Sequence, residues 1–198
     1  MRVGRHINFK KIRKGTHEEE INTTLVSDFI NLNTNNNIIK RGLKIKYNKK
    51  DNSNKIIIQA SSRNGELTPK NWDPNKFRFL INFINSEYKE YKVVMVGDKN
   101  ESSYIEKIIK GTRAINNAGN STVFDLYKDV VTANLVICHD SSVMHIADTN
   151  NIPCVVLLGP TDFSRTGPKS LNTIPIVSVN QSTMYMYNLE ENEETTVN

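Results

Sequence analysis

Long apolar runs are absent from this chain of 198 residues. A membrane-spanning helix needs about 18 or more consecutive apolar residues, and no stretch approaches that length, so no membrane span is expected. The first residues, MRVGRHINFKKIRK, are basic but lack the apolar segment that a secretory signal requires. These absences predict a cytoplasmic protein.

Cysteine is also scarce, with only Cys138 and Cys154 in the sequence. Small secreted domains usually carry several disulfides, so this scarcity favours a reducing compartment. Cys138 ends one predicted strand and Cys154 begins the next parallel one. We therefore expect the two residues at opposite ends of the sheet, beyond the ~7 Å Cα separation that a disulfide tolerates.

Several motifs that would identify a nucleotide site or an enzyme are missing. There is no G-x-G-x-x-G and no P-loop, so nicotinamide and Walker-type sites are unsupported. The pair His139–Asp140 follows a strand and lacks the further helical ligands of metal phosphohydrolases, so no metal site is predicted. Asp140, Ser141 and His145 contain triad chemistry, but no G-x-S-x-G elbow presents the serine.

Charge is unevenly distributed, and the basic side dominates. The formal net charge is +5, with a pI of about 9.1, which suits an anionic partner. Much of the basic excess lies in the first fifty residues, where few aromatic residues are interleaved, so nucleic acid is not the expected partner. The last residues are acidic instead.

From Lys55 onward, apolar runs alternate with helix-start signals. The runs that predict strands are 55–60, 92–97, 114–116, 135–138, the run from 154, and 174–179. The helix starts between them are Asp73 with Pro74, Ser102 or Ser103, the capping box of Thr122 with Asp125, and Ser142. Strands alternating with helices predict an α/β fold with a Rossmann-like, doubly wound parallel sheet.

Three segments follow from this pattern. Residues 1–15 show no periodicity and are expected to form a basic arm. Thr16 with Glu19 forms a capping box that opens an amphipathic helix over 16–32, and we include it in a domain spanning 16–180. Residues 181–198 are expected to be an acidic, flexible tail.

The stretch Asn134–Pro168 organises the rest of the chain. It reads as a strand, a polar turn, a helix beginning near Ser142, a second strand and a Gly-Pro-Thr-Asp loop. Helix amino ends attract phosphate. If the strand order is 3-2-1-4-5-6, the loops Gln59–Trp72 and His139–His145 meet where ligands bind such sheets. This predicts a phosphate-bearing ligand.

Each candidate side chain also has a structural interpretation. Lys70 could neutralise a diphosphate or be a solvated surface lysine. Ser141 and Ser142 could bind phosphate, cap the helix, or do both. Asp140 could hold the turn or contact a ligand hydroxyl, and His145 could face the turn or be structural.

The segments ANLVICHDSSVMHIAD and IPCVVLLGPTDFSRTGP resemble the carboxyl-terminal signature of the heptosyltransferases, glycosyltransferase family 9. PKNWDPNKF and GNSTVFDL are similar to two further segments of that family. The resemblance covers about Thr16 to Thr173. It implies that this chain is the second, donor-binding half of a GT-B glycosyltransferase.

The resemblance implies inverting, metal-independent transfer of a sugar from a nucleotide donor, such as ADP-heptose, to a lipopolysaccharide or related glycan acceptor. No cofactor is implied, and a lipid-linked acceptor would place the protein in the cytoplasm or at the inner face of the cytoplasmic membrane. Carried over by position, the donor-binding residues would be Ser61, Ser62 and Lys70 for the phosphates, Asp98 or Glu101 for the ribose, and Asp140, Ser141, Ser142 and His145 for the diphosphate and sugar.

Two departures from the family pattern matter. Ser142 stands where the family usually has Gly, which lets backbone approach phosphate closely. The family's first domain, with its general-base aspartate, is not in this sequence, and Gly97–Asp98 is not that motif because it follows an internal strand. We therefore expect no catalytic residue here and a separate acceptor-binding domain or chain as partner.

The alternatives are a non-catalytic or degenerate nucleotide-sugar-binding module, and an epimerase or hydrolase on the same scaffold.

Overall fold

The computed structural model describes residues 20, 54–61, 71–159 and 163–177. The elements in chain order are β1 (Lys55–Ile58), α2 (Pro74–Glu87), β2 (Lys92–Met95), the 3-10 turn η3 (Lys99–Glu101), α3 (Ser102–Ile109), β3 (Ile115–Asn116), α4 (Val123–Val131), β4 (Leu135–His139), α5 (Ser142–Thr149), β5 (Cys154–Leu158), α6 (Phe163–Thr166) and β6 (Thr173–Val177). Each of the six predicted strands is confirmed, as are the helices expected to begin near 74, 102, 123 and 142.

The three terminal predictions, for 1–15, for the helix at 16–32 and for the tail at 181–198, lie outside the described residues except at Glu20. Glu20 is helical, and its carboxylate oxygen lies 3.8 Å from the ammonium nitrogen of Lys169. Within the part of the chain that the structure describes, no helix is long and apolar enough to cross a membrane.

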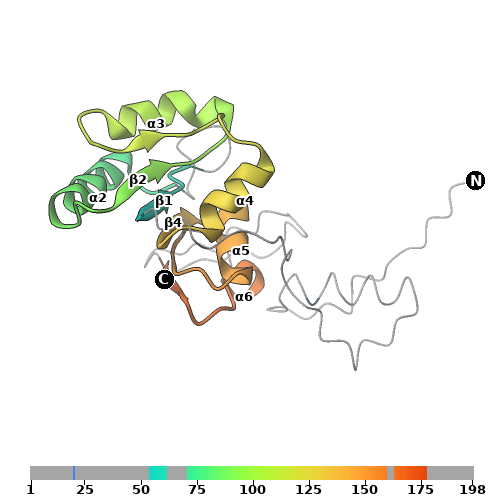
Figure 1. Cartoon of the computed structure of the whole chain (residues 1–198). Helices are drawn as coiled ribbons and strands as arrows, with labels where there is room; N and C mark the ends of the chain where they lie inside the picture. Colours follow the sequence, from blue (N-terminus) through green and yellow to red (C-terminus); the bar gives the residue numbers. More distant parts are fainter. Residues whose placement is uncertain (1–19, 21–53, 62–70, 160–162, 178–198) are drawn as a thin grey trace, which may run out of the picture.

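The six strands form one sheet in the order β3-β2-β1-β4-β5-β6, and every neighbouring pair is parallel. Parallel neighbours need crossovers, and the helices supply them on both faces of the sheet. The predicted order is therefore confirmed. β1 and β4 lie side by side at the centre, where the direction of winding reverses (Figure 1).

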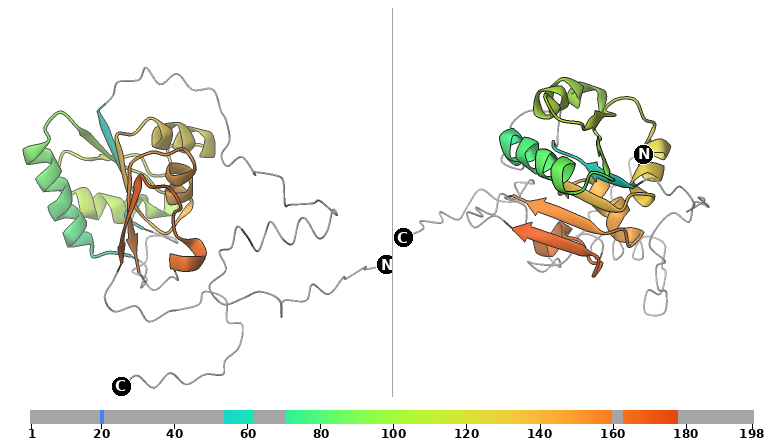
Figure 2. Two further views of the ribbon diagram at one scale, coloured as in Figure 1. Left: turned by 90° about the horizontal axis from the view of Figure 1, so that it is seen from below. Right: turned by 60° about the vertical axis from the view of Figure 1, so that its left-hand side comes forward.

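Alternating side chains on each strand build two apolar layers. Ile56 and Ile58 of β1 pack in a cluster with Phe77 and Ile81 of α2 and with residues of α3. Ile57, between them, points to the other face and packs in a cluster with residues of α4 and α5. The left view of Figure 2 shows the resulting layers, with α2 on one side of the strands and α5 and α6 on the other.

Local polar signals set where the helices begin. Asp73 caps α2 by accepting from the N–H of Asn75 at 2.7 Å, with Pro74 in the first turn. Thr122 and Asp125 form the predicted capping box at α4. α3 begins at Ser102 as predicted but has no side-chain cap of its own, because Asp98 caps the preceding turn η3, which runs directly into the helix.

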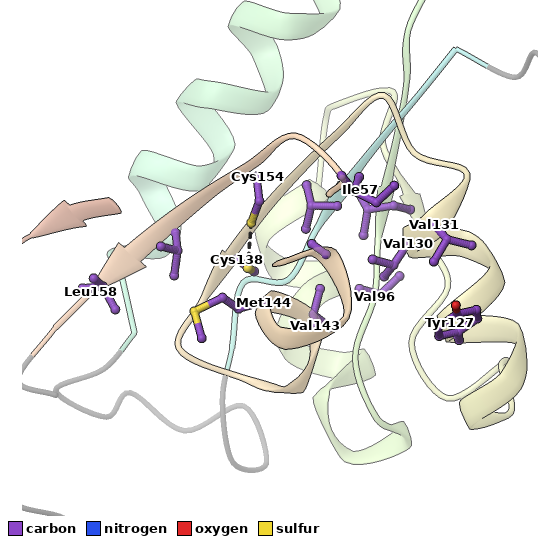
Figure 3. Packing of buried hydrophobic residues seen from close by; sticks show 14 residues of the cluster. Ile57, Val96, Tyr127, Val130, Val131, Cys138, Val143, Met144, Cys154 and Leu158 are labelled. Carbon is purple, nitrogen blue, oxygen red and sulfur yellow. Dashed lines mark hydrogen bonds between the residues drawn. The ribbon is translucent and has the colours of Figure 1, made fainter. Parts of the chain in front are cut away.

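The expected separation of the two cysteines is wrong. Val136 of β4 is in register with Cys154, so Cys138 lies only two residues farther along the neighbouring strand and on the same face. Both residues are free and buried, and their sulfurs face one another at 3.7 Å (Figure 3). The hydrogen bond with Cys154, followed by burial, raises the pKa of the Cys138 thiol well above its ordinary value. Because the thiolate is the reactive form, the raised pKa makes the Cys138 thiol less reactive toward thiol reagents.

Candidate functional site

A cleft of about 440 Å³ opens at the carboxyl ends of the central strands. Its lining includes residues that lie one or two positions after the ends of four strands of the sheet: Gln59 after β1, Gly97 after β2, Asn117 after β3 and Asp140 after β4. The remaining lining residues are Val96, Asp98, Glu101, Ser121, Thr122, Val123, Leu126, Ser141, Ser142 and Val143. The cleft thus lies at the switch point between β1 and β4, where doubly wound sheets bind ligands.

The amino end of α5 forms part of this cleft. Ser141 is the N-cap residue, but its side chain makes no hydrogen bond to the first turn of the helix. The Ser141 hydroxyl instead donates to the side-chain oxygen of Gln59 across the switch point. The first N–H groups of a helix carry a partial positive charge, so this end of α5 can receive an anion.

Asp140 ties the turn after β4 to the segment that follows β5. The hydroxyl of Thr166, in α6, donates to an Asp140 carboxylate oxygen at 3.2 Å. Asp140 lines the cleft as well. Both interpretations offered for this residue, holding the turn and facing a ligand, are compatible with its position.

The two acidic candidates for the ribose are bonded to one another's backbone. Asp98 accepts from the N–H groups of Asn100 at 2.7 Å and Glu101 at 3.1 Å, and Glu101 accepts from the N–H of Asp98 at 2.9 Å. Glu101 is buried and Asp98 is exposed. A side-chain carbon at Gly97 would lie 2.5 Å from a Glu101 carboxylate oxygen. Glu101 therefore supports this wall, and Asp98 is the acidic residue better placed to meet a ligand.

The opposite end of the cleft comes from the residues before and within α4. Thr122 and Asp125 form the capping box, and Asn117 donates to the Ser121 hydroxyl at 2.9 Å. Val123 and Leu126 add apolar surface. Sequence reasoning found the capping box and singled out GNSTVFDL, but it named neither Asn117 nor Ser121 as a site residue.

Ser61 and His139 lie buried near the same switch point. Ser61 is 1% exposed, and its hydroxyl has no hydrogen-bond partner among the residues that the structure describes. The His139 Nε2 accepts from the backbone N–H of Trp72 at 2.9 Å, and its ring packs against Phe77. His139 therefore holds the backbone at Trp72, a positioning role that sequence reasoning did not assign to it.

The other predicted site residues divide into two groups. Ser62 and Lys70 lie outside the described residues. His145 is described and exposed, its backbone N–H donates to the Ser141 carbonyl at 3.3 Å, and it is not among the residues that line the cleft. Within the described ranges, no group of three or more His, Cys, Asp or Glu side chains is arranged to hold a metal ion.

Several solved structures share the fold of this chain. Solved structures similar to this chain include the glycosyl transferase family 9 from Veillonella parvula DSM 2008, at 19% identity and TM-score 0.57, which covers 82% of this chain and 41% of that one. The E. coli ADP-heptose lps heptosyltransferase II is 20% identical, with TM-score 0.56 and coverage of 79% and 43%. The E. coli heptosyltransferase WaaC with ADP is 15% identical, with TM-score 0.60 and coverage of 84% and 52%.

The chain thus spans 41% to 52% of the length of these solved proteins, and their fold is the GT-B architecture of which it forms one Rossmann-like half. No curated protein matches the sequence. The profile of glycosyltransferase family 9 (heptosyltransferase) matches residues 9–195, which is nearly the whole sequence. The chain therefore belongs to glycosyltransferase family 9.

Proposed function

We propose that this chain binds a nucleotide-diphosphate sugar, of the ADP-heptose class, as the donor half of a glycosyltransferase. The observation that carries the proposal is the cleft at the switch point, into which the uncapped amino end of α5 contributes Ser141 and Ser142. Its volume of about 440 Å³ lies in the range of small-ligand sites. Structures of the E. coli relative hold ADP and ADP-2-deoxy-2-fluoro heptose, which supports this choice of ligand.

In the proposed complex the donor lies across the carboxyl ends of the central strands. Its diphosphate meets the start of α5, with Ser61, Ser62 and Lys70 supplying further donors. Asp98 accepts from a ribose hydroxyl, while Glu101 holds the loop that presents it. The base lies toward α4, where Val123 and Leu126 offer apolar contact. His145 is assigned to the sugar end.

The proposed chemistry is an inverting displacement. An acceptor hydroxyl oxygen attacks the anomeric carbon, the bond from that carbon to the diphosphate oxygen breaks, and the nucleoside diphosphate departs with the electron pair. The acceptor proton passes to a general base on an acceptor-binding domain or chain. Negative charge grows on the leaving diphosphate, where the fixed N–H groups of α5 and the Lys70 ammonium stabilise it without a metal.

We place the acceptor, a lipid-linked glycan, at the inner face of the cytoplasmic membrane. A non-catalytic donor-binding module is the second candidate, because Ser142 adds a side chain at the position where close phosphate approach is needed.

Calorimetry with ADP-, UDP-, GDP- and CMP-sugars tests the proposal. We expect an ADP- or UDP-sugar to bind, with the same affinity in Mg²⁺ and in EDTA, and no transfer until an acceptor domain is added. Binding by none of the four classes would refute the donor role. Release of free sugar from the donor alone would instead indicate a hydrolase.

A further inference from the structure

Gln59 connects the two central strands at the rim of the cleft. Its backbone N–H donates to the carbonyl of Ile137 in β4 at 2.9 Å, which continues the pairing of β1 with β4. Its side-chain oxygen accepts from the Ser141 hydroxyl. A single residue at the end of β1 thereby fixes both the strand register and the orientation of the side chain that begins α5.

The bond to Gln59 changes what Ser141 does. A serine at the N-cap normally accepts from an N–H of the first helical turn, as Asp73, Asp98 and Thr122 do at α2, η3 and α4. Ser141 makes no such bond. Among the described residues, no side chain accepts from the N–H groups of Val143 and Met144, the positions that an N-cap side chain normally serves, so they are left for another acceptor.

We propose that Gln59 is a positioning residue of the donor site, which withholds the Ser141 cap so that a donor phosphate oxygen can take its place. The inference rests on the proposed function, since it concerns how that site is kept ready. A competing cap would have to be displaced by each incoming ligand. By holding the hydroxyl away, Gln59 removes that competition before the ligand arrives.

The decisive experiment compares Gln59→Leu, Ser141→Ala and the double variant, with ADP as the calorimetric probe. Leucine removes the acceptor at similar size, so the Ser141 hydroxyl is free to cap α5. We expect Gln59→Leu to weaken ADP binding about tenfold, the equivalent of one hydrogen bond. Adding Ser141→Ala removes the competing cap and should return the affinity to within about threefold of the Ser141→Ala single variant.

Thermal unfolding supplies an independent readout. Ser141→Ala should lower the Tm by about 2–4 °C more in the Gln59→Leu background than in the wild type, because the serine caps the helix only there. Asn134→Leu is the matched control, since the Asn134 side chain accepts from the Lys55 N–H at 2.8 Å at the opposite ends of the same two strands. It should lower the Tm without changing ADP affinity.

The outcomes separate the two proposals. A wild-type protein that binds neither ADP nor any nucleotide sugar would refute the donor role, and the inference about Gln59 with it. Binding by the wild type together with a double variant as weak as Gln59→Leu would overturn the positioning role alone, because the lost affinity would then reflect direct contact or general damage.

Discussion

The two walls of the cleft are built in opposite ways. On the wall formed after β2 and β3, polar side chains are bonded within the wall: Asp98 and Glu101 each accept from the other's backbone N–H, and the Thr122 hydroxyl donates to Asp125. On the wall formed after β1 and β4, the Ser141 hydroxyl bonds across to Gln59 and leaves the start of α5 without a side-chain cap. We refer to these as the closed wall and the open wall.

The difference teaches which part of a ligand each wall suits. The closed wall holds its polar side chains through internal hydrogen bonds, so it offers a fixed shape, apolar surface from Val123 and Leu126, and the exposed carboxylate of Asp98. The open wall offers helix N–H groups that an anion can satisfy. The predictions below set changes on one wall against matched changes on the other or elsewhere in the domain.

Placing a carboxylate on the open wall should have the largest effect. Ser142→Asp puts a negative charge at the first residue of α5, where it interacts favourably with the helix end but repels a diphosphate. Two charges about 4 Å apart interact by about 4 kcal/mol near a protein surface, so we expect ADP affinity to fall about 100-fold or more. The Tm should stay level or rise slightly.

Phe124→Asp is the control for that variant. Phe124 lies in the first turn of α4, is 56% exposed and does not line the cleft. The Phe124→Asp variant places the same negative charge at the start of α4. Because salt screens charges at that distance, ADP affinity should change less than about threefold. Equal losses in both variants would show that net charge, rather than the open wall, controls binding.

Crowding the closed wall should be the next largest effect. Gly97→Ala places a carbon 2.5 Å from the Glu101 carboxylate oxygen and 3.2 Å from Ile105. We expect about 1–3 kcal/mol of destabilisation, measured by urea unfolding. If the carboxylate is the main obstacle, Gly97→Ala combined with Glu101→Ala should cost less than the sum of the single variants. Additive costs would assign the strain to Ile105 instead.

Removing the Ser142 side chain from the open wall should have a smaller effect, and it should strengthen ADP binding instead of weakening it. Ser142→Gly removes the side chain at the first position of α5 and should raise ADP affinity about threefold by allowing closer approach. Ser103→Gly makes the same change at an exposed residue of α3, outside the cleft, and should leave ADP affinity unaltered. An unchanged affinity for Ser142→Gly would count against the view that Ser142 weakens this site.

Much of the closed wall could be predicted from the sequence, because the patterns that indicate it involve residues close together in the chain. The Thr122–Asp125 capping box and the apolar runs of the six strands depend on neighbouring residues, and both were identified correctly. The Asp98–Glu101 box has the same spacing, but sequence reasoning did not identify it as a cap and considered the two residues only as alternatives for binding the ribose. Local patterns thus revealed the elements more readily than the purpose of a side chain.

The open wall could not be predicted in the same way, because its contacts cross between strands. The Gln59–Ser141 bond joins residues 82 positions apart, and it requires the register of β1 on β4. The wrong prediction for the two cysteines has the same origin, because it depended on the register of β5 on β4. That register pairs Val136 with Cys154, which brings Cys138 and Cys154 into contact. Strand order follows from a common topology, whereas register and side-chain direction need coordinates.

Lowering the pH should reduce the stability of the closed wall through Asp125, and this is the smallest of the expected effects. Hydrogen bonds that the Asp125 carboxylate accepts from Thr122, first from its hydroxyl and second from its backbone N–H, lower the pKa of Asp125 below its ordinary value. A carboxyl whose pKa is lowered by folding adds stability above its unfolded pKa of about 3.9, and this stability is lost as the pH falls through the folded value. Asp125→Asn should therefore flatten the decline of Tm below about pH 4 and lower the Tm slightly at neutral pH. Parallel Tm–pH curves for the two proteins would show that the capping box contributes no acid sensitivity, and that the closed wall is held by packing alone.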